Sequence, residues 1–350
     1  MRILFIFANY QGGGFYRCFY PGKQLEERGN EVLFTEDLAV DIDDVPDLSY
    51  DLYVFQLAQS QRALDLMRKL GEAGKVRVYD MDDDIQAIPA QNPAFEEFRD
   101  GKIGLMMQCM KEADAVTVAT SELAELYSSY NQYMFPLPNC TDFSDEHWDR
   151  PGREDDGKVV IGWAGSQSHV EDFKIVMSTL ERICRKYPFV QVAIGGPENI
   201  FDSLTGIPDD QKIFFPAVNF YEYPETLTRF DIGLVPLVDN RFNSCKSHLK
   251  GIEYGRLAIP FLASPAASYE RLITEGENGF LCSRPREWLS RLTFLIENPD
   301  ARRAMGLKAL AAARLWDVTD FSFLWEGLYA ALLKQKHAST LLNTATPNWG

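Results

Sequence analysis

The sequence lacks any long hydrophobic run. Among its 350 residues, no apolar stretch approaches the length of about 20 that a transmembrane helix needs. The apolar start, residues 3–8, is short and leads into glycines, so it predicts a buried strand and not a signal peptide. Positive charge is also scarce. The net charge of −16 argues against non-specific binding to DNA or anionic membranes, although a local basic groove would be compatible with it.

Paired cysteines and metal-ligand spacings are absent as well. The six cysteines are scattered and form no Cys-x-x-Cys motif, which predicts reduced thiols in a cytoplasmic protein. There are only four histidines, and no spacing of metal-ligating residues predicts a bound metal. We therefore expect neither a metal nor another resident cofactor. No short internal repeat is present.

What is present is an alternation of apolar strands and helical patterns, which predicts the α/β class. The 46% hydrophobic and 25% charged fractions are those of an ordinary globular protein. A chain of this length predicts two domains of about 150 residues each. We expect a first domain over 1–145, a second over 155–318 and a final helix over 319–336. The polar segment 142–157 would be the linker.

The most informative stretch is 239–264, a polar loop followed by a predicted helix over 248–257. Ser247 is predicted to cap this helix, and Lys246 and Lys250 to project from one side of its first turn. A helix N-terminus with two lysines favours a diphosphate. Glu253, two turns beyond Lys246, is placed to accept hydrogen bonds from ribose hydroxyls. The alternative is a surface helix with solvated lysines and an exposed glutamate.

Two turns of the second domain are also candidates for ligand binding. Gly165 and Ser166 follow its first strand and precede a helix, a favourable geometry for an anion. His169 begins that helix, and its role is either catalytic or structural. Gly195 and Gly196 end the next strand, either beside a nucleobase or as a tight turn alone.

In the first domain, a loop of three glycines follows the first strand. At Gly13 and Gly14 a ligand can approach the backbone closely, unless the loop is flexible and empty. It is not a G-x-G-x-x-G motif, so a dinucleotide is not expected. Arg17 follows and would neutralise a phosphate or form a surface salt bridge. The acidic segment 36–51 predicts a solvated loop without chemistry.

An acidic cluster, residues 80–84, follows the predicted strand 76–79. Ligands of open α/β sheets bind at the carboxyl ends of strands. Adjacent carboxylates repel one another, which favours a general-base or metal-binding role for Asp82, Asp83 or Asp84. The alternative is a loop in which one aspartate caps the next segment. The pattern does not identify which aspartate would face a ligand.

Together these motifs resemble GT-B glycosyltransferases, most closely the family 4 type of bacteria and their phages. In the second domain the matching residues are 231–237, Phe242, Asn243, Lys246, Ser247, Lys250, Glu253, Tyr254, Ile259, Pro260, Ser264 and 278–281. Gly165, Ser166 and His169 match a Gly-Trp-Ala-Gly-Ser-x-x-His motif. Tyr16 and Arg17 resemble a pair in related first loops.

The resemblance implies two Rossmann-like domains facing a central cleft, with the last helix crossing back to the first domain. It places a nucleotide sugar on the second domain, with Lys246 and Lys250 on the diphosphate and Glu253 on the ribose. It also implies retention of configuration without a metal. Two departures stand out. Cys245 occupies the place of a glutamate near the donor sugar, and residues 1–146 lack the histidine often found near the transferred sugar. An aspartate of 82–84 would take the place of that histidine or act as the base of an inverting reaction.

We therefore expect a glycosyltransferase that moves a sugar from a UDP- or GDP-sugar to an acceptor hydroxyl. The acceptor would be a glycan, a lipid-linked molecule, a protein or a modified nucleobase, and the oligomeric state is open. The catalytic candidates are Asp82, Asp83, Asp84, Lys246 and His169. The donor-binding candidates are Gly13, Gly14, Arg17, Gly165, Ser166, Lys246, Ser247, Lys250 and Glu253. The alternatives are a GT-B-type UDP-sugar epimerase, a phage DNA glycosyltransferase and an inactive nucleotide-sugar-binding protein.

Overall fold

The computed structural model describes residues 1–8, 12–36, 49–90, 92, 94–99 and 101–345. The chain divides into two compact units. Unit 1 comprises Met1–Gln86, Phe98–Cys140 and Val318–Gly350, and unit 2 comprises Ala87–Glu97 and Thr141–Asp317. Most of the predicted acidic loop, residues 37–48, lies outside the described residues.

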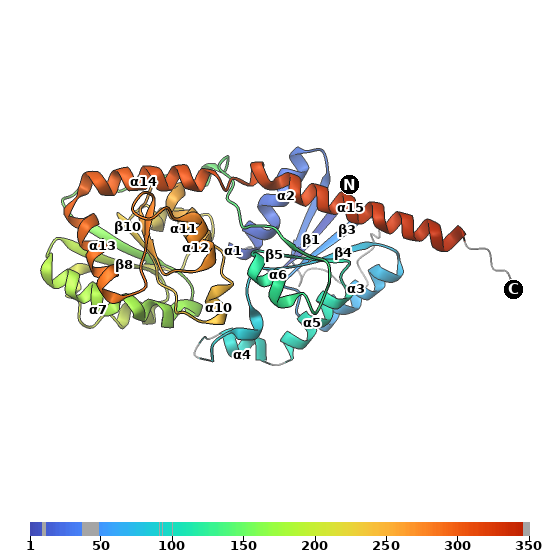
Figure 1. Ribbon diagram of the computed structural model, residues 1–350, viewed down its shortest axis with the longest axis horizontal. Coiled ribbons are helices and arrows are strands. Elements are labelled where there is room, and N and C mark those ends of the chain that lie inside the picture. The colour runs from blue at the N-terminus through green and yellow to red at the C-terminus, as the bar shows by residue number, and fades with distance from the viewer. Residues whose placement is uncertain (9–11, 37–48, 91, 93, 100, 346–350) are drawn as a thin grey trace. The chain divides into compact units, whose positions relative to one another are not determined.

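Unit 1 is built on a parallel six-stranded sheet with the order β2-β1-β3-β4-β5-β6 (Figure 1). Its strands are β1 (Arg2–Phe7), β2 (Glu31–Glu36), β3 (Leu52–Gln56), β4 (Val76–Met81), β5 (Ala115–Val118) and β6 (Met134–Pro136). The chain passes from β2 at one edge across β1 to β3, so the carboxyl ends of β1 and β3 form a topological switch point. Ligands of doubly wound sheets bind at such points.

The helices of unit 1 lie between these strands in the chain, except α15, which follows unit 2. They are α1 (Gly12–Gly14), a π-helical turn (Phe15–Phe19), α2 (Tyr20–Glu27), α3 (Gln61–Glu72), a 3-10 turn (Ile85–Ala87), α5 (Lys102–Glu112), α6 (Ser121–Tyr127) and α15 (Val318–Ala345). A further helix, α4 (Ala94–Arg99), spans the boundary between the two units.

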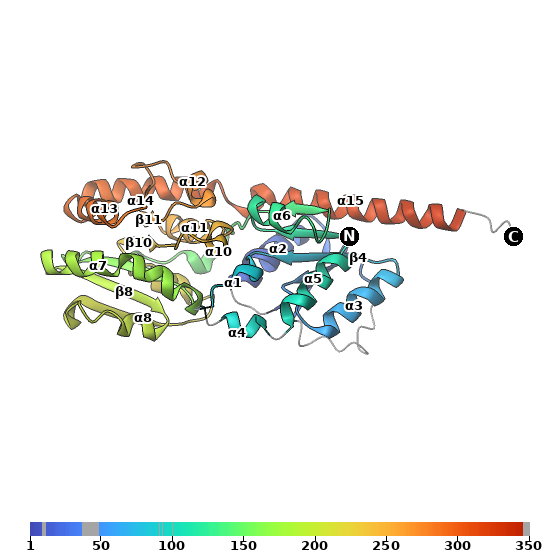
Figure 2. The ribbon, with the colours of Figure 1, turned by 60° about the horizontal axis from the view of Figure 1, so that its bottom comes forward.

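The C-terminal helix α15 completes the core of unit 1. Trp325, Tyr329 and Leu332 are buried among residues of β1, β3 and β4. Arg28, at the end of α2, donates to Ser322 Oγ at 2.9 Å and to Glu326 at 3.1 Å. Figures 1 and 2 both show α15 running beside α2. The last helix therefore packs against the first unit, as the resemblance implied.

Unit 2 contains a second parallel six-stranded sheet, with the order β12-β11-β10-β7-β8-β9. Its strands are β7 (Val159–Ala164), β8 (Val190–Gly196), β9 (Lys212–Pro216), β10 (Ile232–Val235), β11 (Phe261–Ala263) and β12 (Gly279–Leu281). Numbered along the chain within the unit, this is the strand order 3-2-1-4-5-6 of dinucleotide-binding Rossmann folds. Its switch point lies between β7 and β10.

The helices of unit 2 lie on both faces of its sheet (Figure 2). They are α7 (Val170–Lys186), α8 (Glu198–Asp202), α9 (Tyr223–Leu227), α10 (Arg241–Ser244), α11 (Leu249–Arg256), α12 (Ala267–Leu272), α13 (Pro285–Glu297) and α14 (Pro299–Arg314). Short 3-10 turns occur at Glu146–Trp148, Gln167–His169 and Asp209–Gln211.

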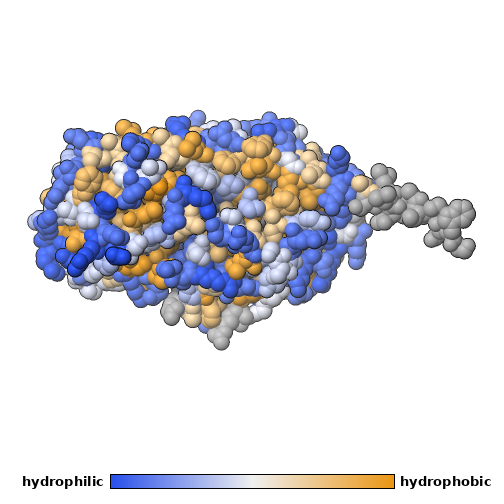
Figure 3. Space-filling view, in the orientation of Figure 1, coloured by the Kyte–Doolittle hydropathy of each residue, from blue (hydrophilic) through white to orange (hydrophobic). Residues whose placement is uncertain are grey.

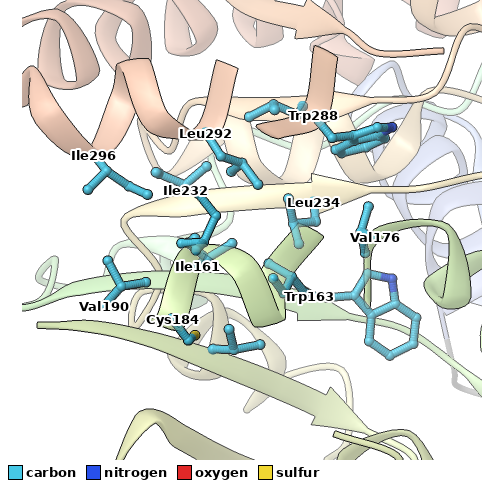
Figure 4. Packing of buried hydrophobic residues seen from close by; sticks show 14 of the residues in the cluster. Ile161, Trp163, Val176, Cys184, Val190, Ile232, Leu234, Trp288, Leu292 and Ile296 are labelled. Carbon is cyan, nitrogen blue, oxygen red and sulfur yellow. The ribbon is translucent and has the colours of Figure 1, made fainter. Parts of the chain in front are cut away.

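Alternation along the strands assigns side chains to the two faces. Ile161 and Ile232 point to the face covered by α7 and α13, where they pack with Leu292 (Figure 4). On the opposite face the strands carry glycine. A Cβ at Gly162 would lie 2.0 Å from the ring of Phe230, and a Cβ at Gly233 would lie 2.7 Å from the ring of Tyr254. The missing side chains therefore let large aromatic residues approach the sheet.

Several predicted boundaries are corrected by the structure. The helical spacing of residues 95–112 predicts one helix, but Gly101 adopts φ +82° and separates α4 from α5. The spacing of residues 221–230 likewise predicts a longer helix than the observed α9. Gly12–Gly14 is helical and not a loop. The expected linker 142–157 lies within unit 2, where Trp148 is buried and Arg256 donates to backbone carbonyls of Asp142 and Asp145.

The face drawn in Figure 3 mixes hydrophilic residues with small hydrophobic patches. Among the described residues, none of the helices combines the length and apolar character that crossing a membrane requires.

Candidate functional site

The candidate site of unit 2 lies at the carboxyl ends of β7 and β10, the switch point of that sheet. β7 ends at Ala164 and leads through Gly165 and Ser166 to the first turn of α7. β10 ends at Val235 and leads through α10 to α11, so the residues of both predicted motifs follow these two strands. The topology therefore brings together two segments about 80 residues apart at the place where such sheets bind ligands.

A buried aspartate ties the two segments together. Asp172, in the first turn of α7, accepts from Val238 N at 2.8 Å and from Asn243 Nδ2 at 2.7 Å through one oxygen. Its other oxygen lies 2.8 Å from His169 Nδ1. Sequence patterns had indicated His169 and Asn243, but Asp172 was missed because an acidic residue in a first helical turn is an ordinary capping feature.

His169 is held as a neutral imidazole. Burial lowers its pKa below the usual value, the hydrogen bond to Asp172 opposes that effect, and the positive charges of Lys246 and Lys250 lower the pKa further. Both ammonium groups therefore act on the same ring. This electrostatic link between His169 and the two lysines is compatible with an anion site.

The local structure around the lysines differs from the predicted helix. The N-cap position of α11 is His248, with no capping hydrogen bond from its side chain, so the prediction that Ser247 caps the helix is wrong. Lys246 precedes α11 and does not share a helical face with Lys250. Its ammonium lies 4.3 Å from the centroid of the Phe242 ring. The segment before α11 forms a separate short helix, α10, which was not predicted. Asn240 caps α10 by accepting a hydrogen bond from the backbone N–H of residue 243 at 2.8 Å.

Glu253 is buried and not an exposed surface glutamate. Its carboxylate accepts from the hydroxyl of Tyr223 at 3.0 Å and from Lys250 Nζ at 3.4 Å. Lys250 also donates to the Tyr223 hydroxyl at 2.8 Å, which closes a three-membered cluster. Burial and the charge of Glu253 raise the pKa of Tyr223 well above its usual range, so this tyrosine stays protonated and donates. No sequence motif pointed to Tyr223.

The glycines at the ends of β7 and β8 serve close packing. A Cβ at Gly165 would lie 2.5 Å from the ring of Trp163, and a Cβ at Gly196 would lie 2.2 Å from the carbonyl oxygen of Gly165. Gly196 also adopts φ +124°. Steric need alone therefore explains the Gly195-Gly196 turn. Ser166 is exposed at this edge, with its hydroxyl 2.6 Å from that of Ser168.

In unit 1, Arg17 is enclosed. Its guanidinium, 0% exposed, forms two bonds to Asp80, from Nε to Oδ1 at 3.0 Å and from Nη2 to Oδ2 at 2.6 Å. It also donates to Leu137 O and Asn139 Oδ1, and Thr117 donates to Asp80 at 2.6 Å. Both roles predicted for Arg17, a phosphate contact and a surface salt bridge, are corrected. It forms a buried ion pair that joins the π-helical turn before α2 to β4 and to the segment after β6.

The structure separates the three candidate aspartates. Asp84 is fully buried and accepts from the Tyr127 hydroxyl at 2.6 Å. Asp82 and Asp83 are partly exposed. A Cβ placed at Gly13 would lie 3.4 Å from Asp82 Oδ2 and 3.5 Å from Gln56 Nε2. Asp82 therefore lies beside the glycine segment at the switch point of the unit 1 sheet.

Gln56 is the other residue that sequence reasoning missed there. It ends β3, is buried, and its side-chain oxygen accepts from Ala8 N at 3.2 Å. Its amide thus fixes the end of β1 next to Gly13. Gly14 is buried and helical, with φ −61°, so no left-handed conformation demands glycine at this position. Within the described ranges, no group of three or more histidine, cysteine, aspartate and glutamate side chains could hold a metal ion.

Two parallel six-stranded sheets, each wound with helices, define the GT-B fold, and solved structures share it with this chain. No protein-family model and no curated protein sequence matches the chain. HepE of Anabaena, in a crystal with UDP and glucose, superposes with a TM-score of 0.68 at 14% identity, over 95% of this chain and 100% of that one. Sucrose-phosphate synthase of Thermosynechococcus elongatus gives 0.67 at 12% identity, over 96% and 100%. A putative UDP-N-acetylglucosamine 2-epimerase of Listeria monocytogenes gives 0.56 at 10% identity, over 92% and 93%.

Proposed function

We propose that the protein is a glycosyltransferase that moves a sugar from a UDP-sugar to an acceptor hydroxyl, with retention of configuration and without a metal. The observation that carries this proposal is the hydrogen bond between Lys250 and the buried Glu253 in the segment that follows β10, together with the electrostatic effect of Lys246 and Lys250 on His169 after β7, at the switch point of the unit 2 sheet. The cations suit a diphosphate, and the carboxylate suits the ribose hydroxyls. The UDP and glucose bound to HepE in its crystal support the choice of uridine and of a hexose.

The chemistry of such a transfer places its main demand on the leaving group. The bond between the anomeric carbon of the sugar and the distal phosphate breaks, and negative charge grows on the diphosphate. Lys246, Lys250 and the N-terminus of α11 are the groups of this chain that would stabilise that charge. A neutral His169 uses its single N–H, on Nδ1, to donate to Asp172, so its Nε2 would accept a hydrogen bond from a hydroxyl of the donor.

For the acceptor side we propose Asp82. It is the aspartate of the cluster that is partly exposed and lies beside Gly13 at a strand end. Asp83 is the second choice, since it is partly exposed too. Asp84 is buried against Tyr127, which favours a structural role.

The test is binding followed by product analysis. Calorimetric titration with UDP, GDP, dTDP and CDP should show the tightest binding for UDP, and Lys250→Ala should weaken it. Lys174→Ala, an exposed lysine of the same unit paired with Glu171, is the matched control and should bind like the wild type. If none of the four nucleotides binds, the proposal is wrong.

A second candidate is a UDP-sugar epimerase, which the likeness to the Listeria protein favours. It would use the same donor residues but need no acceptor. Incubation with UDP-glucose and with UDP-N-acetylglucosamine, each with and without an acceptor mixture, separates the two. UDP release that depends on acceptor supports the transferase, and an altered sugar formed without acceptor supports the epimerase.

A further inference from the structure

A cavity of about 530 Å³ lies in unit 2, and the residues of the candidate site at the switch point do not line it. Lys158, Asp231 and Pro260 line it, and they directly precede strands β7, β10 and β11. These strands are parallel, so the cavity opens at the amino-terminal edge of the sheet, whereas Lys246, Lys250 and Glu253 follow the carboxyl-terminal edge. A ligand in this cavity would not compete with one at the switch point.

The lining is rich in positive charge. It contains six basic and three acidic side chains, in a chain whose overall charge is −16. The basic ones are Arg150, Arg153, Lys158, Arg256, Arg302 and Arg303, and the acidic ones are Asp149, Asp155 and Asp231. Such a local reversal of the overall charge focuses a positive potential in the cavity.

Two of the arginines hold the segments that line the cavity together. Arg153 binds Asp156 at 2.6 Å and Asp231 at 3.0 Å, and so fixes the segment before β7 to the start of β10. Arg256 donates to the backbone carbonyl of Asp145 at 2.8 Å and lies over the ring of Trp148. These contacts stabilise the cavity and do not involve the other basic side chains of its lining.

Three further cations have no carboxylate within 4.0 Å in the described structure. Arg150 donates to the carbonyl of His147 at 3.0 Å, and Arg302 donates to the carbonyl of Leu295 at 2.8 Å. Lys158 has no side-chain hydrogen bond among the described residues. The burial of Arg302 lowers its pKa; the charge of Asp231 opposes this, and the charge of Arg303 adds to it. The basic side chains of the lining therefore outnumber the acidic ones, and within the described residues Arg150, Lys158 and Arg302 are not in ion pairs with them.

We propose that this cavity binds a small organic phosphate, whose phosphoryl group is held by Lys158, Arg150 and Arg302. A phosphomonoester carries about −1.5 to −2 charges at pH 7 and matches the fork of a guanidinium. The volume falls within the range of about 300 to 1,000 Å³ of small-molecule sites, larger than a bare ion needs. The organic part would lie against Phe230, Ile259 and Pro260. This proposal does not depend on the reaction at the switch point.

The test is titration with inorganic phosphate, glycerol 3-phosphate and glucose 1-phosphate, each in the presence of saturating UDP and at constant ionic strength. The organic phosphates should bind saturably and more tightly than inorganic phosphate. Lys158→Glu should weaken this binding at least tenfold, and Arg150→Gln should weaken it less. Arg185→Glu, at an exposed residue of α7, is the control with the same change of charge and should have no effect.

Circular dichroism of each variant establishes that it is folded. If Lys158→Glu proves unstable, Arg150→Gln takes its place in the test, because it removes only one exposed charge. UDP affinity should be unchanged in all of these variants. Absence of saturable binding by the wild type overturns the proposal. So does equal weakening by Arg185→Glu, and so does displacement of the phosphates by UDP. Equal affinity for inorganic phosphate overturns the assignment of an organic ligand.

Discussion

Replacement of Glu253 tests the donor site most directly. Its carboxylate is 4% exposed and is held at 3.0 Å by Tyr223 and at 3.4 Å by Lys250. If it also accepts hydrogen bonds from the ribose, Glu253→Gln removes the charge while keeping the size of the side chain. Hydrogen bonds to a charged group contribute about 1.5–3 kcal/mol, so the Kd for UDP should rise about 10- to 150-fold.

The same replacement also affects the folded protein. Removing the carboxylate leaves Lys250 without its partner in a largely enclosed cluster, which should lower the free energy of unfolding by about 1–3 kcal/mol. Tyr223→Phe is the matched comparison, because it removes one hydrogen bond to Glu253 and keeps the charge. Its effect on the Kd should be smaller, about fivefold for a loss near 1 kcal/mol.

The decisive assay compares UDP with 2′,3′-dideoxyuridine diphosphate by calorimetric titration of the wild type and Glu253→Gln. If Glu253 binds the ribose, the substitution should weaken UDP strongly and the dideoxy analogue little, because the analogue has already lost the hydroxyls. Urea unfolding of each variant gives the folded fraction for correction. An equal loss of affinity for both ligands would refute the ribose contact.

Four further outcomes are expected. Lys246→Ala and Lys250→Ala should each lower kcat by about 100-fold or more, and normal turnover of the double variant would show that the lysines are only solvated. Lys246→Ala should change the unfolding free energy little, whereas Lys250→Ala should lower it by about 1–3 kcal/mol, because buried Glu253 loses its cation. Asp82→Asn should abolish transfer and spare UDP affinity, whereas Asp84→Asn should mainly lose about 1–3 kcal/mol of stability; the reverse pattern would exchange their roles. EDTA should leave turnover intact, and a metal-reversible loss would contradict the mechanism. Burial lowers the pKa of His248 from 6.5 to about 3, so below pH 6.5 the unfolded chain binds a proton that the folded protein does not, and the free energy of unfolding falls. Urea unfolding at pH 7 and at pH 5 should show a smaller fall for His248→Gln than for the wild type.

The strands of both sheets were predictable because parallel strands are buried on both faces and form continuous apolar runs. β1, for example, lies within a residue of the predicted strand 3–8. Strand order was not predictable from these runs, since it depends on where each crossover returns to the sheet. The break at Gly101 was hidden by the apolar periodicity on both sides of it.

At the site, sequence pointed to residue types with distinctive local patterns, and missed their partners. Lys250 and Glu253 belong to one helical segment, but Tyr223 reaches Glu253 from 30 positions earlier and carries no motif. Arg17 was misjudged for the same reason. Its partner Asp80 lies 63 positions away, and an isolated arginine gives no sign of being enclosed.

The return of α15 to unit 1 has a consequence for how the chain folds as it is synthesised. Trp325, Tyr329 and Leu332 belong to the core of unit 1, yet the ribosome adds them only after all of unit 2. Domains generally fold as they emerge, the N-terminal one first. Here the second unit has its whole sequence available before the first does, and the nascent first unit exposes the apolar surface around β1 and β3 until the last helix arrives. That interval is when a chaperone would have most to bind.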